Sequence, residues 1–89
     1  MYKITYHQRI PEDLECISTA QKKIIKKAIE EKLSADPQFF GKPLQFSLKG
    51  LRSLRVGNYR VVFQIIDEEI FIVLIEHRST VYKSIKKRQ

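Results

Sequence analysis

The sequence predicts an α+β fold: an N-terminal strand and a two-helix hairpin packed on a small, mainly antiparallel four-stranded sheet, with a short C-terminal helix. Apolar residues alternate over 2–7 and over 59–66, the period of half-buried strands. Over 19–35 they recur at i, i+4 spacing, as on one side of a helix. Two short turns join three strand-like runs within 49–82. A chain of 89 residues is expected to form one domain, 1–89.

The helical part is predicted to begin with a short helix at 11–17, because proline suits the first turn of a helix. Ser18 is expected to cap the second helix, with Gln21 completing a capping box, and Pro37 to end it. Two adjoining apolar rows of this helix are predicted to meet the sheet: Ala20, Ile24 and Ala28, and Ile25, Ile29 and Leu33.

The two strands around Gly57 carry arginines in a definite phase. Alternation places Arg60 and Gln64 on the open side of the sheet, opposite the side that meets the helices. The same alternation on the preceding strand places Arg55 on the open side. Arg52 falls in the core phase, so we expect it at an edge or irregular start of its strand.

The remaining sequence excludes several kinds of site. Residues 70–75 are all apolar, which indicates an interior strand, and this run is far below the ~20 residues that span a bilayer. A basic helix is expected in 79–89.

Cys16 is the single cysteine, which fits a reducing, cytoplasmic setting, and its side chain is expected to fill space in the core. His7, Cys16 and His77 lack metal-ligand spacing, so neither a metal nor a cofactor is predicted.

The net charge of +7 is concentrated in the second half of the chain. Residues 1–41 hold seven basic and six acidic side chains, whereas residues 42–89 hold ten basic and four acidic ones. This asymmetry favours a polyanionic partner, either nucleic acid or an acidic protein segment. A solvated surface without a partner is the alternative interpretation.

Arg55 and Arg60 on one open face indicate phosphate binding, because guanidinium groups bind phosphate oxygens bidentately. Such donors would stabilise the charge that develops when a ribose 2′-hydroxyl attacks its neighbouring phosphate. His77 is the histidine beside this basic cluster, and an imidazole can serve as base or acid. Each residue also has a structural alternative: an ion pair with Asp67 or Glu69 for Arg60, backbone hydrogen bonding for His77, and helix packing for Tyr82.

The string LRSLRVGNYRVVFQIIDEEIFIVLIEHRSTVYK resembles the C-terminal half of the RelE/ParE superfamily of toxins from type II toxin–antitoxin modules. It carries R-V-G-x-Y-R-V, an acidic turn, an apolar strand and H-R-x-x-V-Y, in that order. The predicted order of strand, helix pair and three-strand meander matches as well, so the resemblance extends over nearly the whole chain.

The resemblance implies a RelE-like fold and the activity of a ribosome-dependent mRNA endonuclease. The implied partners of this enzyme are the ribosome, mRNA and a cognate antitoxin that neutralises it. It implies catalytic roles for Arg60, His77, Tyr82 and Arg55, and RNA-binding roles for Lys49, Arg52, Arg78 and Lys83. The chain departs from the nuclease pattern at Ser53 and Glu76, which lie where basic residues are often found. A ParE-type inhibitor of DNA gyrase and a non-catalytic, antitoxin-binding co-repressor on the same fold remain the alternatives.

Overall fold

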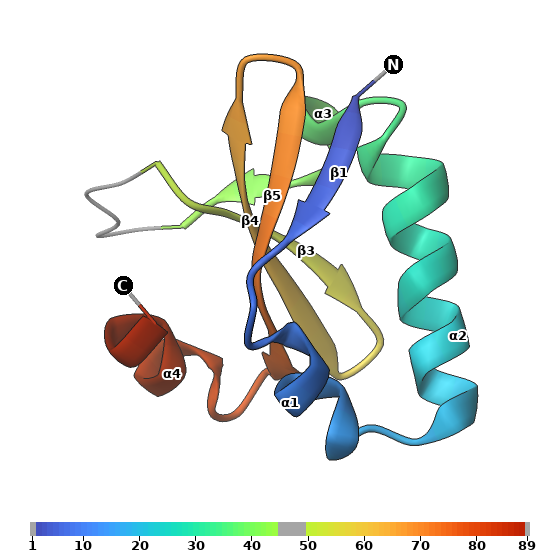
Figure 1. Ribbon diagram of the computed structural model, residues 1–89, viewed down its shortest axis with the longest axis vertical. Helices are drawn as coiled ribbons and strands as arrows, with labels where there is room; N and C mark the ends of the chain where they lie inside the picture. The colour runs from blue at the N-terminus through green and yellow to red at the C-terminus, as the bar shows by residue number, and fades with distance from the viewer. Residues whose placement is uncertain (1, 45–49, 89) are drawn as a thin grey trace.

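The computed structural model describes residues 2–44 and 50–88, which form one sheet with helices on both sides (Figure 1). The elements in chain order are β1 (Lys3–Tyr6), α1 (Ile10–Glu15), α2 (Thr19–Ala28), the π-helical turn η1 (Ile29–Leu33), α3 (Pro37–Phe40), β2 (Lys42–Pro43), β3 (Arg52–Val56), β4 (Tyr59–Ile66), β5 (Glu69–His77) and α4 (Val81–Arg88). The predicted α+β class and element order are confirmed.

The sheet has five strands in the order β1-β5-β4-β3-β2. β3, β4 and β5 form the predicted antiparallel meander, and β1 lies parallel to β5. The predicted count of four strands was wrong, because Lys42 and Pro43 pair with Ser53 and Arg52 and add β2 at the edge. A two-residue strand is too short to show an alternating pattern, so the sequence carries no signal for it.

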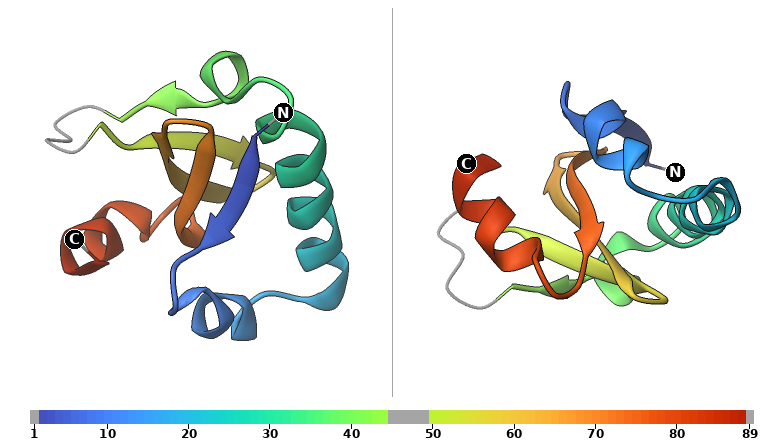
Figure 2. Two further views of the ribbon diagram at one scale, coloured as in Figure 1. Left: turned by 45° about the horizontal axis from the view of Figure 1, so that its top comes forward. Right: turned by 90° about the horizontal axis from the view of Figure 1, so that it is seen from below.

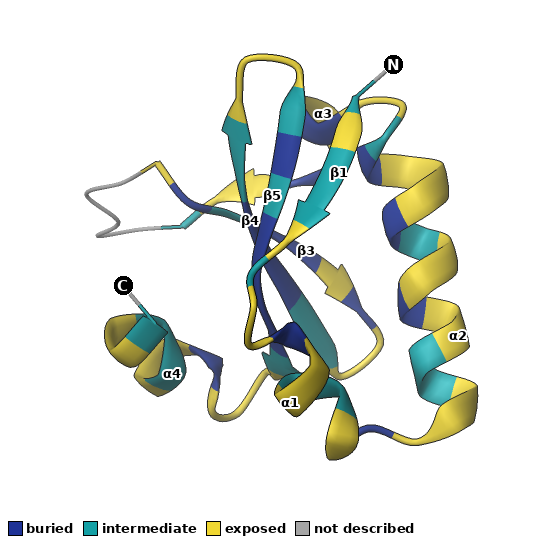
Figure 3. Ribbon diagram, in the orientation of Figure 1, coloured by how far each residue is buried: buried dark blue, intermediate teal, exposed yellow. Residues whose placement is uncertain are grey.

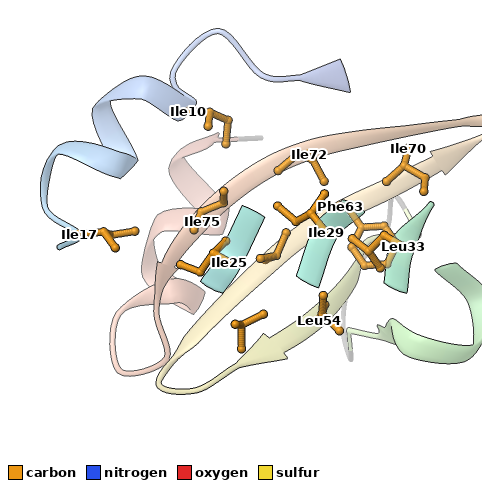
Figure 4. Close-up of a cluster of buried hydrophobic side chains, with 12 residues drawn as sticks. Ile10, Ile17, Ile25, Ile29, Leu33, Leu54, Phe63, Ile70, Ile72 and Ile75 are labelled. Atoms are coloured by element: carbon orange, nitrogen blue, oxygen red, sulfur yellow. The ribbon is translucent and has the colours of Figure 1, made fainter. Parts of the chain in front are cut away.

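One side of the sheet, here called the helix face, packs against α1, α2 and η1. Buried residues of the helices and of β3, β4 and β5 form the main core there, with Phe63 close to Ile29 and Leu33 (Figure 4). Of the two predicted helix rows, the row of Ile25, Ile29 and Leu33 is buried as expected. The other row was partly wrong, since Ile24 is 55% exposed. Figure 3 shows that α2 buries only its sheet-facing side.

The predicted helix over 19–35 changes its winding before it ends. Ser18 caps α2 as expected, with its hydroxyl accepting a hydrogen bond from the Gln21 backbone N–H at 3.2 Å. The last turn is π-helical, because the Ser34 N–H donates to the carbonyl of Ile29, five residues back, at 3.3 Å. Both Ile29 and Leu33 stay buried through this turn, so the apolar row remains on the sheet.

The opposite side of the sheet, here called the arginine face, carries Ser53, Arg55, Arg60, Val62, Leu74 and Glu76. This face was predicted to be open to solvent, but only part of it is. α4 crosses the other part, where Val81 packs against Val62 and Leu74 in a second core. Figure 2 shows α4 on the side of the sheet away from α2. The apolar residues of this face are thereby covered, Arg60 and Glu76 are half-buried, with Glu76 contacting α4 through Ser84, and Arg55 is exposed.

A buried ion pair joins the two ends of the chain. Arg88 of α4 donates to both carboxylate oxygens of Asp13 of α1, at 2.8 and 3.2 Å, and to the Val73 carbonyl at 2.8 Å. Asp13 also accepts a hydrogen bond from the Ile75 N–H at 3.1 Å. Both charged side chains are only 7% exposed. The pair therefore holds α1 and α4 against the edge of β5, where no strand of the described residues pairs with β5 beyond the end of β1. None of the described helices has the length and apolar content that crossing a bilayer requires.

Candidate phosphate-binding and proton-transfer site

Arg55 and Arg60 lie directly opposite each other on β3 and β4, with their side chains on the arginine face. The Arg60 Nη1 donates to the Ser53 hydroxyl at 3.2 Å, and the Arg55 Nε donates to the Gly57 carbonyl at 3.2 Å. The prediction that both arginines share this face is confirmed, but their convergence on one hollow is not: Arg60 extends toward Ser53 and Arg55 toward Gly57, in opposite directions along β3, and neither lines a cleft found among the described residues. Ser53 is buried, so the Arg60 guanidinium is fixed over the sheet while the exposed Arg55 lies beside the turn.

The ion-pair alternative for Arg60 is wrong. Among residues 2–44 and 50–88 the ion pairs are Arg9–Glu12, Lys26–Glu30 and Arg88–Asp13, and none includes Arg60. Two like charges opposite each other on a sheet are destabilising unless an anion lies near them. Each guanidinium group is a donor that can bind a phosphate oxygen on this face.

A carboxylate completes this row on the next strand. Glu76 of β5 is the register partner of Arg60, and its side chain lies on the same face. The Ser84 hydroxyl of α4 donates to Glu76 Oε2 at 2.5 Å. The sequence marks Glu76 only as a departure from the nuclease pattern and predicts no functional role for it. The sequence held no signal for this position, because β5 is apolar on both faces and the side taken by Glu76 is known only once the strand is paired with β4.

His77 does not join the arginines, contrary to expectation. It pairs in register with Tyr59, and the two rings meet edge to face with their centroids 5.5 Å apart. Tyr59 packs against the main core, so His77 extends on the helix-face side of β5. Its Nδ1 contacts the Ser79 hydroxyl at 2.8 Å and accepts from the Ser79 N–H at 3.2 Å. The sequence could not show this, because a strand must be paired before its phase is known.

A cleft lies at the free edge of β5, between α1 and α4. It has a volume of about 520 Å³, and both Glu76 and His77 line it from the two sides of the strand. Arg55 and Arg60 are not among its lining residues. The row of Arg55, Arg60 and Glu76 therefore runs across the sheet and ends at the cleft, where His77 is reached around the edge of β5.

The other predicted site residues are distributed around this row. Tyr82 is 55% exposed at the start of α4, directly after the buried Val81 that packs on the arginine face. The core-packing alternative for Tyr82 is therefore wrong. Lys83 is exposed in the same turn, and Arg78 is exposed in the loop before it, where its backbone N–H donates to the Asn58 carbonyl at 2.8 Å.

Of the two remaining predicted RNA-binding residues, Arg52 lies away from the arginine row, and the position of Lys49 is not described. Arg52 is half-buried at the strand edge, as its phase required, and its Nη1 donates to the Gly41 carbonyl at 3.0 Å. It lies in the core phase, away from Arg55 and Arg60. Lys49 lies outside the described residues.

Cys16 was expected to be buried and is exposed instead. It lies at the end of α1, where it lines the cleft and is not in the core. Within the described ranges, no three His, Cys, Asp or Glu side chains gather as a metal site would require.

Comparison with known families gives one matching model. Residues 4–82 match the model described as the ParE toxin of the type II toxin–antitoxin system parDE. The match covers β1 through the first turn of α4, so it includes the arginine row, Glu76 and His77.

Two curated toxins of Mycobacterium tuberculosis are similar over part of their length. The chain is 40% identical to toxin RelG over 53 residues, which are 57% of this chain and 61% of RelG. It is 44% identical to toxin RelE over 50 residues, which are 54% of this chain and 52% of RelE. The matched region thus spans little more than half of either relative.

Solved structures match over most of the chain. The RelBE2 toxin–antitoxin complex of M. tuberculosis has a chain that is 28% identical, with a TM-score of 0.78, covering 86% of this chain and 98% of that one. The isolated RelE toxin of E. coli is 22% identical, with a TM-score of 0.72, covering 99% of this chain and 98% of that one. Because the identity to the E. coli toxin is only 22%, this similarity shows a shared fold and no more.

Proposed function

The chain belongs to the ParE toxin family of type II toxin–antitoxin systems, within the RelE/ParE superfamily, and we propose that it is a ribosome-dependent mRNA endonuclease. The observation that carries the proposal is the pairing of Arg55 with Arg60 in register on one sheet face, where neither arginine takes part in an ion pair among the described residues. The similarity to two toxins of the RelE group supports the nuclease over other members of the superfamily.

In the proposed reaction the 2′-hydroxyl of the message attacks the adjacent phosphate, and negative charge grows on the non-bridging oxygens. In this proposal Arg60, which donates a hydrogen bond to Ser53, binds one of these oxygens, and the exposed Arg55 turns from Gly57 to bind another. Donors that are already in position stabilise the transition state without having to reorganise. Guanidinium groups keep their charge at every physiological pH, so this part of the site needs no titration.

The remaining residues act around the phosphate in the proposed mechanism. Tyr82, exposed beside the arginine face, offers a ring on which a base can stack. Arg78 and Lys83 are exposed next to it and contact the RNA backbone. His77 transfers a proton from the cleft at the edge of β5 and does not bind the phosphate in the arginine row.

We further propose that a cognate antitoxin holds the protein inactive in the cytoplasm. The RelBE2 structure is a toxin–antitoxin complex, and this chain is 28% identical to its matched chain. Residues 42–89 of this chain hold ten basic and four acidic side chains. An acidic antitoxin segment would therefore have a charge complementary to that of the arginine face.

The test is cleavage of a defined message on translating ribosomes, read by primer extension. Cleavage by the wild type and a loss of at least hundredfold in Arg60→Ala and Arg55→Ala are expected. Arg52→Ala is the matched control, because it removes the same charge from the other side of the sheet. Each variant is checked by circular dichroism and thermal melting. Full activity in Arg60→Ala would contradict the proposed site, and an inactive wild type would contradict the nuclease.

The matching family model is described as a ParE toxin, so a second candidate function is inhibition of DNA gyrase by a ParE-type mechanism. A supercoiling assay with purified gyrase, run beside the ribosome assay, separates the two. Inhibited supercoiling without RNA cleavage would establish the gyrase inhibitor. If neither activity is found and expression without an antitoxin is harmless, the protein is a non-catalytic co-repressor.

A further inference from the structure

We propose that Glu76 is the general base of the cleavage reaction, an inference that rests on the nuclease function proposed above. It is the carboxylate that shares the arginine face and register with Arg60, and the sequence comparison alone assigned it no role.

The position of Glu76 follows from strand pairing. Arg55, Arg60 and Glu76 are consecutive register partners across β3, β4 and β5, so the three side chains leave the sheet on one face in one row. Neighbouring Cβ atoms in such a row are about 5 Å apart. A phosphate bound at Arg60 would therefore have its attached ribose beside Glu76, the register partner of Arg60 on the next strand.

The carboxylate of Glu76 forms no ion pair with any described residue. The Arg60 guanidinium extends along the sheet to the Ser53 hydroxyl, and the ion pairs of the described residues do not include Glu76. Ser84 donates to Oε2 at 2.5 Å, and no hydrogen bond involving Oε1 is found among the described residues. One oxygen anchors the side chain, and the other is left to accept a proton.

Glu76 is also accessible. It is half-buried, and it lines the cleft at the free edge of β5 together with His77. A substrate on the arginine face and solvent in the cleft thus reach the same carboxylate. The arginines of the row cannot replace it, because a guanidinium has no lone pair with which to accept a proton in a protein.

The proposed step is a transesterification at phosphorus. Glu76 takes the proton of the ribose 2′-hydroxyl as the oxygen forms a bond to phosphorus. The bond from phosphorus to the 5′-oxygen breaks, and a 2′,3′-cyclic phosphate remains on the upstream fragment. The leaving 5′-oxygen takes a proton from the His77 imidazolium across the edge of β5. Glu76 and His77 then exchange their protons with water in the cleft.

The competing explanation is structural, since Glu76 also anchors α4 through Ser84. Two substitutions separate the roles. Glu76→Gln keeps a group that hydrogen bonds to Ser84 but cannot act as a base. Ser84→Ala removes the anchor and keeps the carboxylate. Glu68→Gln, the same chemical change in the exposed turn before β5, is the matched control.

Single-turnover cleavage on ribosomes is measured with each variant. Glu76→Gln is expected to lose at least a hundredfold in rate with an unchanged melting temperature, since general base catalysis contributes 10²–10⁴-fold. Ser84→Ala is expected to lose less than tenfold, and Glu68→Gln nothing. Activity of Glu76→Gln within threefold of the wild type would overturn the inference and leave the nuclease function standing. Equal losses in Glu76→Gln and Ser84→Ala would overturn it in favour of anchoring.

The direction of proton transfer is tested with a message that carries sulfur in place of the scissile 5′-oxygen. A thiolate leaves without a proton, so this substrate restores cleavage to a variant that lacks its general acid. It is expected to rescue His77→Gln and not Glu76→Gln. Rescue of Glu76→Gln would show that the carboxyl donates a proton, and would overturn the assignment. If the wild type cuts neither message, the nuclease function and this inference both fall.

Discussion

Replacing Arg88 by methionine removes the cation from the buried ion pair between α4 and α1. The substitution keeps most of the apolar stem of the side chain and leaves the Asp13 carboxylate only 7% exposed with no cation beside it. The Val73 carbonyl loses its hydrogen bond from Arg88 as well. We therefore expect a large loss of stability from a change at the second-to-last residue of the chain.

The magnitude follows from the burial of the pair. Removing one partner of a buried ion pair costs about 3–5 kcal/mol, because the other charge is left without compensation. The hydrogen bond from the Ile75 N–H to Asp13 remains, so the lower value is appropriate. A domain of this size has a total stability of roughly 4–13 kcal/mol. A loss of 3 kcal/mol corresponds to a decrease in melting temperature of roughly 12–24 °C.

The assay is thermal and urea unfolding followed by circular dichroism. Asp13→Asn combined with Arg88→Met is expected to be more stable than Arg88→Met alone, because the double variant buries no lone charge. Lys26→Ala is the control, since its ion pair with Glu30 is 4.0 Å long and exposed and is worth only tenths of a kcal/mol. The reasoning is refuted if Arg88→Met melts within about 4 °C of the wild type, or if the double variant is the less stable one.

Further predictions concern Tyr6, Gly41 and Cys16. Burial and the nearby Glu30 carboxylate raise the pKa of Tyr6 above 10.0, so its stabilising contribution is present below that pH and is lost as pH rises. Tyr6→Phe should therefore lose less stability than the wild type between about pH 9 and 11 in urea titrations, and an equal loss would contradict the assignment. Gly41→Ala places a Cβ 2.1 Å from the Phe63 ring and 2.9 Å from the Pro37 carbonyl, which should cost about 1–3 kcal/mol. Gly50→Ala, which meets nothing within 4 Å but has a φ of 65°, is its control, and a larger cost there would refute the steric explanation. Cys16 should react with a thiol reagent in the native protein at the rate of a free thiol, and protection until unfolding would show that the exposed position is wrong.

Much of the fold follows from local patterns. Alternation fixed the strands of the meander and the phases of Arg55 and Arg60, because one face of each strand must be buried. Gly57 and Asp67, with φ of 61° and 54°, close the two turns where the sequence indicated them. The helical spacing of Ile25, Ile29 and Leu33 predicted that they are buried together, and all three are buried. In each case the information lies within one element and its neighbour along the chain.

The sequence by itself therefore determined the class of the fold, the family, and the two arginines that share one face. Only the tertiary structure decided that Glu76 completes their row, that His77 lies around the edge of β5, and that α4 covers half of the arginine face. The physical reason is that β5 is apolar on both faces, so its periodicity does not say which way its polar end points until pairing with β4 sets the register. The link from Arg88 to Asp13 joins residues 75 positions apart, and no local pattern contains it.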